Sequence, residues 1–346
     1  MCVKCFEAVG NDYEMGFAVG CVFKDYLQDI AARRGKVFED PDVEAFIGGI
    51  IARIEDKTPD CMAELRGRAA GAEIPLGLAT VLSSPEISGL MSGCTTAILK
   101  RSDGSWLFSH NEDETNFTQD NVALVKYVYD DAWIVGYTMA ETLVGRSFAY
   151  NSHGMVFSCN YLMGARRDVT HPSRYIAIRD ILKARNLEET LDMMKAAETA
   201  SSFSLNVLDT RTGMAANVEK TVDDTYITPI YERFSHANHF IVGADELSFG
   251  VNTYNRGAKT EELLNRLDAE TAGIEDVVDV LSYEGEDYWH SILKKPDTYK
   301  DLWENGHKSV TVANFAYDGE NHRIFIRDYL GNTQLQMPYD EFVSNL

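Results

Sequence analysis

The spacing of apolar residues indicates helices over the first part of the chain. Apolar side chains recur every three or four positions from Gly16 to Asp29, and two more such runs follow Asp40-Pro41-Asp42 and Thr58-Pro59-Asp60. A proline in the first turn, directly behind a capping Asp or Thr, is a common helix start. The pattern therefore predicts that residues 1–93 form a helical layer with few strands.

From residue 94 onward the pattern changes to short apolar runs separated by turn residues. Residues 95–99 and 106–109 flank Ser102-Asp103-Gly104, which is typical of a hairpin turn. The following runs repeat this arrangement, and they are residues 122–129, 133–139, 147–150 and 155–159. We expect these runs to pair as one antiparallel sheet.

Helical spacing returns after Pro172, together with a second group of strands. The helical runs are residues 176–184, 187–197, 257–268 and 274–283. The strand runs are residues 204–208, 214–218, 225–230, 239–242, 310–317 and 323–327. Each sheet needs one face covered by helices, so this order predicts an α+β fold. The expected architecture is a four-layer αββα sandwich, with two antiparallel sheets between helical layers.

Charge and composition argue against a nucleic-acid-binding, membrane or secreted protein. The chain has 346 residues and a net charge of -22, so nucleic acid and anionic membranes are unfavourable partners. The sequence contains no run of 18 apolar residues and no basic leader, and its six cysteines suit reduced thiols, so we expect a cytoplasmic protein. Cys2 and Cys5 lack a second cysteine pair, and they favour a frayed N-terminus over a metal or redox site.

The residues around Cys94 suit a nucleophile that frees its own amino group. Gly93 has no Cβ, so the backbone before Cys94 can adopt conformations closed to other residues. Attack of the thiol on the Gly93 carbonyl would form a thioester, and water would then release residues 1–93. The new α-amine would titrate at about 7.7–8.0 and could serve as base and acid. The alternative is a buried, inert cysteine.

Three polar residues are candidates to assist Cys94. Asp113 lies on the far side of the first hairpin, so strand pairing would return its carboxylate to Cys94, where it could orient the α-ammonium group. Asn160 ends a strand and Asn238 lies in a loop, and either amide could donate to a developing oxyanion. The alternatives are a turn residue for Asp113 and turn or capping residues for the asparagines.

Four motifs in order carry a resemblance to a known family. They are Gly-Cys-Thr-Thr-Ala at 93–97, His-Asn-Glu-Asp at 110–113, NSHGMVFSCNYL at 151–162 and His-Ala-Asn-His-Phe at 236–240. Together they resemble the N-terminal nucleophile hydrolases, and most closely the acyl-coenzyme A:6-aminopenicillanic acid acyltransferase family. The resemblance implies an αββα fold in which a helical proregion, residues 1–93, is cut off and stays bound to the catalytic part, residues 94–346.

The resemblance also implies roles for single residues. Cys94 matches the nucleophile, and Asp113 matches the carboxylate of the family's Asn-Trp-Asp motif. Asn238 matches the asparagine of the family's Thr-Asn-His motif, and Asn160 matches the oxyanion-hole asparagine of the related bile salt hydrolases. Thr96 matches the second threonine, which is expected to support the site as a hydrogen-bond donor.

Two positions depart from the family pattern. Glu112 stands where the family has an aromatic or apolar residue, and its negative charge would favour a cationic substrate. Lys308, preceded by His307, is the nearest counterpart of the family's arginine before its last strand. His110 and Asn111, which belong to the same motif as Glu112, are expected to support the site.

The sequence therefore predicts a self-processing cysteine hydrolase that cleaves a linear amide bond of a small N-acyl compound through a thioester on Cys94. Transfer of the acyl group to an amine is the alternative, because both reactions share the thioester. An uncleaved scaffold without catalytic activity is a third possibility. His236 and His239 have no carboxylate partner apparent in the sequence, so no metal and no cofactor are expected. The acyl group, the amine and the oligomeric state are left open.

Overall fold

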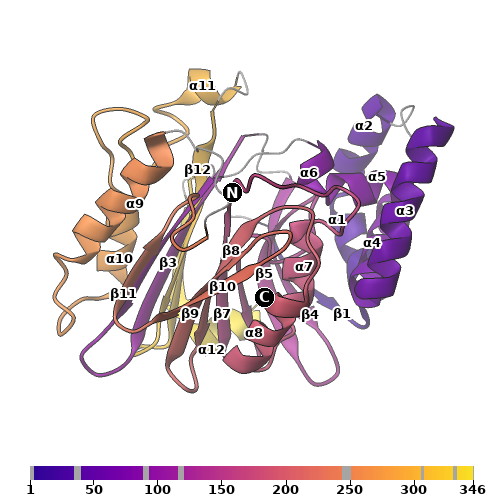
Figure 1. Cartoon of the computed structure of the whole chain (residues 1–346). Helices are drawn as coiled ribbons and strands as arrows, with labels where there is room; N and C mark the ends of the chain where they lie inside the picture. Colours follow the sequence, from indigo (N-terminus) through magenta and orange to yellow (C-terminus); the bar gives the residue numbers. More distant parts are fainter. Residues whose placement is uncertain are drawn as a thin grey trace.

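Two β-sheets face each other at the centre of the molecule, and helices cover their outer faces (Figure 1). The computed structural model describes residues 4–34, 40–88, 93–115, 121–243, 251–304, 308–329 and 333–345. The order of layers confirms the predicted α+β fold and the αββα sandwich.

The two sheets differ in size. The eight-stranded sheet has the order β1-β4-β5-β6-β7-β8-β9-β10, and the six-stranded sheet has the order β11-β2-β3-β12-β13-β14. The strands of the larger sheet are β1 (Lys4–Val9), β4 (Val122–Val128), β5 (Trp133–Met139), β6 (Phe148–Asn151), β7 (Met155–Tyr161), β8 (Phe203–Asp209), β9 (Met214–Lys220) and β10 (Thr225–Ile230). Those of the smaller sheet are β2 (Gly93–Lys100), β3 (Trp106–Glu114), β11 (Arg233–His236), β12 (Val310–Asp318), β13 (Arg323–Asp328) and β14 (Thr333–Pro338).

Helices α1 to α8 lie on the outer side of the larger sheet. They are α1 (Asp12–Val22), α2 (Lys24–Arg34), α3 (Pro41–Lys57), α4 (Pro59–Ala72), α5 (Leu76–Leu82), α6 (Pro85–Ser88), α7 (Arg174–Ile181) and α8 (Leu187–Ala196). The other helices are α9 (Val251–Leu264), α10 (Ile274–Leu281), α11 (Lys300–Glu304) and α12 (Tyr339–Asn345), and α9 and α10 pack on the smaller sheet. No helix among the described residues is long and apolar enough to cross a membrane.

Apolar side chains fill three separate layers of core. The layer between the two sheets is rich in aromatic rings, and those of Phe148 and Phe315 stack with their centres 5.1 Å apart. A second layer lies between the larger sheet and its helices, and a third lies between the smaller sheet and α9 and α10. Both faces of each sheet are therefore buried, as the four-layer prediction requires.

The N-terminal segment differs from the prediction because it contributes a strand. β1 pairs in parallel with β4, with Cys5 opposite Leu124, so the expected frayed end at Cys5 is wrong and the larger sheet contains one parallel pair beside its antiparallel ones. A long connection through helices α1 to α6 separates β1 from β4, and parallel neighbours need such a crossover. The strand predicted at residues 239–242 is absent, and β11 precedes it instead.

The first predicted helix is divided into α1 and α2 at Phe23. Glycines let α1 approach α4 very closely, since a Cβ atom at Gly16 would lie 2.1 Å from the Glu64 carbonyl oxygen. Gly67 of α4 makes the reciprocal approach, where a Cβ atom would lie 2.0 Å from the Tyr13 carbonyl oxygen. This contact fixes α4 over the larger sheet.

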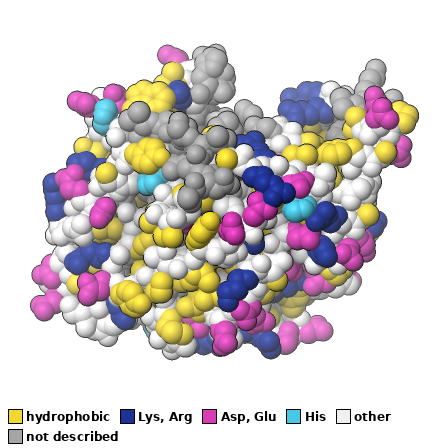
Figure 2. All heavy atoms as spheres, in the orientation of Figure 1, with side chains coloured by type: hydrophobic (Ala, Val, Ile, Leu, Met, Phe, Trp, Pro, Cys, Tyr) yellow, Lys and Arg dark blue, Asp and Glu magenta, His cyan; other side chains and the backbone are white. Residues whose placement is uncertain are grey.

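The net negative charge is distributed over the surface. On the face shown in Figure 2, acidic side chains are interspersed with lysines and arginines and do not form one continuous patch. The net charge of -22 therefore does not mark a binding surface on this face.

Candidate active site

The hairpin of β2 and β3 sets the geometry of the site. The strands pair so that Cys94 lies opposite Glu112 and Gly93 lies opposite Asp113, which confirms the predicted return of Asp113 to the start of β2. Directly opposite residues share a face and successive residues alternate, so Glu112 lies on the same face as Cys94, toward the larger sheet. Asp113 lies on the other face, toward the helices.

Cys94 is buried, and its two reactive groups have separate partners. Its backbone N–H donates to Asn238 Oδ1 at 3.0 Å, and its Sγ lies 3.4 Å from Glu112 Oε2, where the thiol can donate. Burial, and after it the charge of Glu112, raises the pKa of the Cys94 thiol well above its ordinary value. The thiol therefore needs a base before it can act as a nucleophile.

Asn238 uses both ends of its amide to fix the start of β2. Its Oδ1 accepts from Cys94 and, at 2.7 Å, from Nη2 of Arg256, and its Nδ2 donates to the Tyr161 carbonyl at 2.9 Å. Because a guanidinium can only donate, the contact with Arg256 identifies the oxygen of the amide. In this arrangement Asn238 holds the nitrogen of Cys94, and its own N–H groups face Tyr161 and not the thiol.

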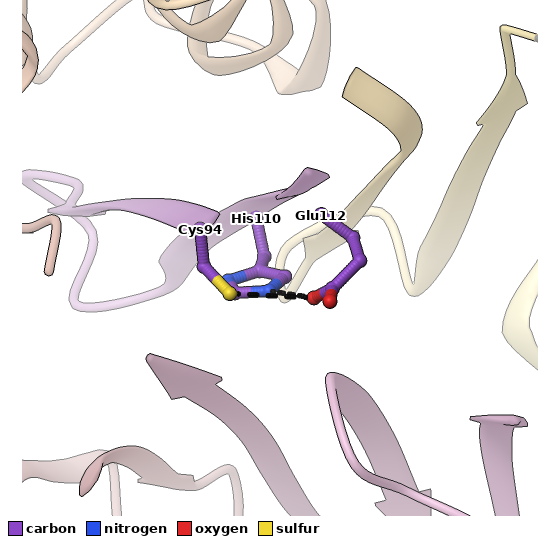
Figure 3. A group of neighbouring side chains, drawn as sticks. All are labelled: Cys94, His110 and Glu112. Carbon is purple, nitrogen blue, oxygen red and sulfur yellow. Dashed lines mark hydrogen bonds and ion pairs between the residues drawn. The ribbon is translucent and has the colours of Figure 1, made fainter. Parts of the chain in front are cut away.

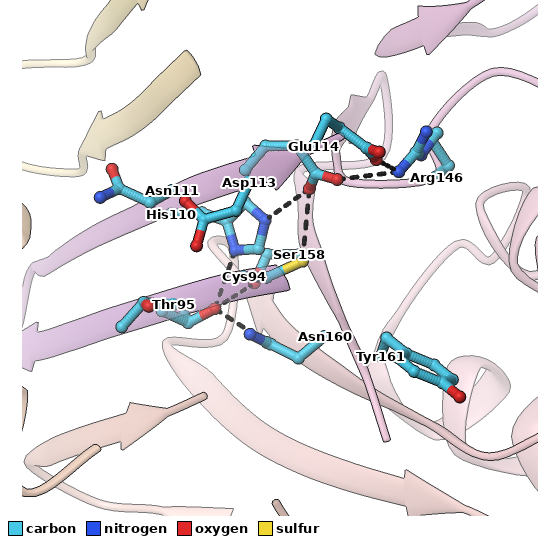
Figure 4. Close-up of polar contacts among 12 residues, drawn as sticks. Cys94, Thr95, His110, Asn111, Asp113, Glu114, Arg146, Ser158, Asn160 and Tyr161 are labelled. Carbon is cyan, nitrogen blue, oxygen red and sulfur yellow. Dashed lines mark hydrogen bonds and ion pairs between the residues drawn. The ribbon is translucent and has the colours of Figure 1, made fainter. Parts of the chain in front are cut away.

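Asn160 lies on β7, facing Cys94 from the opposite sheet (Figure 4). Its Oδ1 accepts from Thr96 Oγ1 at 3.0 Å and from Asn206 Nδ2 at 2.8 Å. Its Nδ2 is buried and has no hydrogen-bond partner among the residues that the structure describes. A buried donor without a partner is costly, so this N–H is available to a developing oxyanion.

A network of buried polar side chains holds Asn160 in place. Thr96 Oγ1 lies 2.9 Å from His110 Nδ1 and 3.1 Å from Ser158 Oγ, and Asn206 Nδ2 donates to Ser158 Oγ at 3.1 Å. All four side chains are fully buried between the sheets. Thr96 and His110 thus lie in one network with Asn160, and the two other members, Ser158 and Asn206, were not foreseen.

Asp113 forms a buried ion pair with Lys294. Lys294 Nζ lies 2.5 Å from Asp113 Oδ2, and Thr311 Oγ1 donates to Oδ1 at 2.7 Å. Burial lowers the pKa of Lys294 to about 8, although the charge of Asp113 partly opposes this shift. Lys308, which was expected as the counterpart of the family's arginine, lies over the ring of Trp289, with its Nζ 4.1 Å from the ring centre.

Asp113 approaches the chain closely at Gly93. A Cβ atom at Gly93 would lie 3.2 Å from Asp113 Oδ2 and 3.3 Å from Asp113 Cβ, which is tighter than ordinary van der Waals contact. The carboxylate of Asp113 thus lies directly beside the peptide bond that joins Gly93 to Cys94.

Glu112 belongs to a buried cluster of charges beside the thiol. Arg146 Nη2 donates to Glu112 Oε1 at 2.9 Å and also contacts Glu114. Burial opposes ionisation of Glu112, but Arg146 and His110 outweigh it and hold the pKa of Glu112 below its usual value. Glu112 is therefore charged at neutral pH.

Asn111 and His236 lie outside this cluster. Asn111 faces the helical side of β3, where its Nδ2 donates to the Leu281 carbonyl at 2.8 Å and its Oδ1 accepts from Asn314 at 2.7 Å. His236 does have a carboxylate partner, because its Nε2 lies 3.3 Å from Glu219 Oε1, contrary to the sequence reading. Glu219 also accepts backbone N–H groups of residues 241–243, and it therefore anchors the loop that follows Asn238.

Sequence reasoning missed three cations of the site. Arg256 lies on α9 and donates to the Cys94 carbonyl at 2.6 Å and to Thr95 Oγ1 at 2.7 Å. Lys294 lies in an irregular segment, and Arg146 lies in a turn between β5 and β6. No motif or periodicity marks these positions, because only the packing of distant segments decides which arginine or lysine points inward.

The family assignment rests on a match over most of the chain. The model of the acyl-coenzyme A:6-aminopenicillanic acid acyl-transferase family matches residues 99–324, a range that begins just after Cys94. A β-alanyl-dopamine/carcinine hydrolase from Drosophila melanogaster is 23% identical over 280 residues, which cover 71% of either chain.

Two solved structures were also compared with the protein. Penicillin V acylase from Agrobacterium tumefaciens has a TM-score of 0.48 at 13% identity, and the match covers 72% of this chain and 87% of that one. A variant of conjugated bile acid hydrolase from Clostridium perfringens has a TM-score of 0.46 at 12% identity, with 72% and 93% covered. Since the family match spans more than half of the sequence, the chain belongs to the acyl-coenzyme A:6-aminopenicillanic acid acyl-transferase family.

Proposed function

We propose that the protein is a self-processing cysteine hydrolase that cleaves a linear amide bond of a small N-acyl compound. The contact that supports this most is the hydrogen bond of 3.0 Å between the backbone nitrogen of Cys94 and Asn238 Oδ1. A nitrogen held this way beside its own thiol is useful as a base only when Cys94 is N-terminal. Cleavage between residues 1–93 and 94–346 is therefore part of the proposal.

Processing would begin with attack of the Cys94 thiol on the Gly93 carbonyl carbon. The nitrogen of Cys94 is still an amide at this stage, so a different group must accept the thiol proton. Glu112 Oε2, at 3.4 Å from Sγ and ionised at neutral pH, is placed to do so. As the C–N bond breaks and the thioester forms, the proton passes from Glu112 to the nitrogen of Cys94. Water then hydrolyses the thioester to leave a carboxylate on Gly93 and an α-amine on Cys94.

Turnover would repeat this chemistry on a bound amide. The α-amine accepts the thiol proton, the sulfur attacks the substrate carbonyl, and the Nδ2 group of Asn160 donates to the oxyanion. The α-ammonium group then protonates the leaving amine, and water hydrolyses the thioester. Asp113, which lies beside Gly93 in the uncut chain, would face the new ammonium group and hold it in place.

The charges next to the thiol support a substrate with an ammonium group. Glu112 and Glu114 contact the same arginine, Arg146, so these three buried side chains carry one negative charge in excess. The relative from Drosophila melanogaster is named for β-alanyl-dopamine and carcinine, and a β-alanyl group carries a primary amine. We therefore propose amides whose acyl part has a free amine.

Acyl transfer remains the second candidate, because the family is described as an acyl-transferase. Both reactions share the thioester, and they differ in whether water or an amine takes the acyl group. Incubation with substrate and a competing amine separates them, since a transferase forms a new amide in preference to the free acid.

The first prediction is that the purified chain is cut before Cys94. Denaturing electrophoresis and mass spectrometry should show residues 1–93 and 94–346 as separate pieces, and the larger piece should begin with Cys-Thr-Thr. The variant Cys94→Ala should stay one chain, while Cys21→Ala, which removes an exposed thiol, should be cut normally.

Cleavage of the Cys94→Ala variant at this bond would exclude Cys94 as the processing nucleophile. A wild-type chain that stays whole after long incubation would favour a scaffold without catalytic activity. The cut protein should release amine from aminoacyl amides faster than from matched neutral N-acyl amides. Equal kcat/KM values for the two series would exclude recognition of the ammonium group.

A further inference from the structure

Three side chains of different chemistry converge at the thiol (Figure 3). Cys94 Sγ, His110 Nε2 and a carboxylate oxygen of Glu112 all lie within 4.8 Å of one another. Oε2 of Glu112 is 3.4 Å from the sulfur and 3.4 Å from the ring nitrogen. Thiolate, imidazole and carboxylate are the three groups that most often bind zinc in proteins.

Two of the three distances between these atoms match those of a tetrahedral zinc site, and the third, from Sγ to Nε2, is within 4.8 Å. Zinc bonds of about 2.3 Å to sulfur and about 2.0–2.2 Å to nitrogen and oxygen place neighbouring ligand atoms about 3.4–3.6 Å apart. Both separations measured from Glu112 Oε2 are 3.4 Å. An ion of this size could therefore be bound with little movement of the ligands, and a water molecule would take the fourth position.

The ligands are already oriented by their neighbours. Thr96 Oγ1 donates to Asn160 Oδ1, so its contact of 2.9 Å with His110 Nδ1 is one in which the ring nitrogen donates. The ring atom that faces the other two ligands is therefore Nε2, and its contact with Glu112 Oε2 would give way to the metal bond when an ion binds. Arg146 holds the second oxygen of Glu112 at 2.9 Å, and such outer contacts are a usual feature of metal sites.

The charge balance also favours a divalent cation. Glu112, Glu114 and Arg146 together carry one negative charge, and a Cys94 thiolate would raise this to two in a fully buried place. Uncompensated charge is costly in such surroundings. A doubly charged ion compensates it completely, whereas the exposed group of Glu286, Asp287 and His290 has no such need because solvent surrounds it.

We propose that a thiophilic divalent cation of the zinc type binds to Cys94, His110 and Glu112 and keeps the nucleophile inactive. On binding, the thiol loses its proton to solvent, a metal–sulfur bond forms, and the hydrated ion releases water; no electron is transferred. The ion would occupy the place of the substrate's ammonium group, so inhibition should be competitive. This last consequence rests on the proposed function, whereas binding of the ion does not.

Binding is tested without any substrate. Equilibrium dialysis of the full chain against buffered Zn²⁺ should give one tightly bound ion per chain after weak sites are competed away with a chelator. Co²⁺ should produce the absorption band of a cobalt–thiolate bond. Cys94→Ser should abolish the band and lower the Zn²⁺ affinity at least 100-fold, and Glu112→Gln should lower it roughly 10-fold or more.

A matched control uses the exposed group, where His290→Ala should leave both the band and the affinity of the buried site unchanged. Thermal denaturation of each variant without metal verifies its fold. If Cys94→Ser is unstable, the cobalt–thiolate band of the unaltered protein shows whether a thiolate binds the ion. The proposed site is wrong if the chain binds no Zn²⁺, or if Cys94→Ser leaves the affinity for Zn²⁺ unchanged.

The two proposals can fail separately. If Zn²⁺ binds but no amide is cleaved, the proposed function is wrong and the metal site stands. If amides are cleaved but no Zn²⁺ binds, the metal site is wrong and the proposed function stands.

Discussion

At the scale of single residues, Asn160 and Asn238 use their amides in opposite ways. The N–H groups of Asn238 are directed to the Tyr161 carbonyl, and its oxygen holds the nitrogen of Cys94. Asn160 has its oxygen engaged and its Nδ2 group without a described partner. The sequence could nominate both asparagines for the oxyanion, but only the packed network separates a donor toward the substrate from a holder of the nucleophile.

We therefore predict that Asn160→Ala lowers kcat by about 10²–10³ with little change in KM, because an oxyanion donor acts mainly in the transition state. Steady-state kinetics on the processed enzyme measure both constants. Asn160→Asp keeps an oxygen acceptor for Thr96 and Asn206 but removes the donor, so it should be equally slow. An active Asn160→Asp enzyme would show that the acceptor, and not the donor, matters.

Lys294 is a titratable cation of the site and pairs with Asp113. Its pKa of about 8 means that the ion pair with Asp113 is intact below this pH and lost as the pH rises through it. The α-amine of Cys94 must lose its proton over a neighbouring range to act as a base. The expected pH profile of kcat/KM is therefore bell-shaped, with Lys294 responsible for its alkaline side.

The variant Lys294→Arg should extend activity to higher pH, because a guanidinium stays charged throughout this range. The measurement is kcat/KM from pH 6 to pH 10 for both proteins, alongside Lys294→Gln, which should be slow at every pH because Asp113 has lost its cation. An identical alkaline limb in the original enzyme and in Lys294→Arg would assign that limb to another group.

At the scale of elements, the hairpin of β2 and β3 explains how far sequence reasoning could reach. Its turn at residues 102–104 and its strand runs were readable, so the return of Asp113 to the neighbourhood of Cys94 was predictable. The side to which Glu112 points was not, because that depends on register, and a shift of one residue turns every side chain to the other face. With Glu112 directly opposite Cys94, the register puts its carboxylate at the thiol.

Other elements were beyond sequence reasoning because their partners lie far away in the chain. β1 was not recognised as a strand, since only the neighbouring edge of β4 gives its backbone groups hydrogen-bond partners. The division between α1 and α2 at Phe23 likewise could not be predicted, because no glycine, proline or other turn residue stands at that position. Helices α3 and α4, which begin at Pro41 and Pro59, carried local start signals and were predicted correctly.

At the scale of the whole molecule, buried charges join the N-terminal helices to the rest of the protein. Glu64 of α4 accepts from Arg179 Nε at 2.7 Å and from the Tyr127 hydroxyl at 2.6 Å, and all three side chains are fully buried. Both partners belong to the segment that would follow the cut. These contacts do not depend on the peptide bond at residue 93, so the two pieces should remain together.

We predict that the processed protein elutes as one species in size-exclusion chromatography and that Glu64→Ala destabilises it. Loss of Glu64 leaves Arg179 buried without its main counter-ion, which costs about 3–5 kcal/mol in comparable cases. Urea denaturation measures the change. The exposed pair of Arg66 and Glu55 provides the control, since Arg66→Ala should hardly move the midpoint. Equal midpoints in all three proteins would contradict a stabilising role for Glu64.

The pairing of β1 with β4 has a consequence for how such an enzyme can be produced. In a polypeptide that begins at Cys94, β4 would be an exposed edge strand of the larger sheet, with the backbone groups of residues 122–128 unpaired on one side. Exposed edge strands pair with strands of other molecules and lead to aggregation. We therefore expect residues 94–346 to fold only when residues 1–93 are supplied with them, in the same chain or by co-expression.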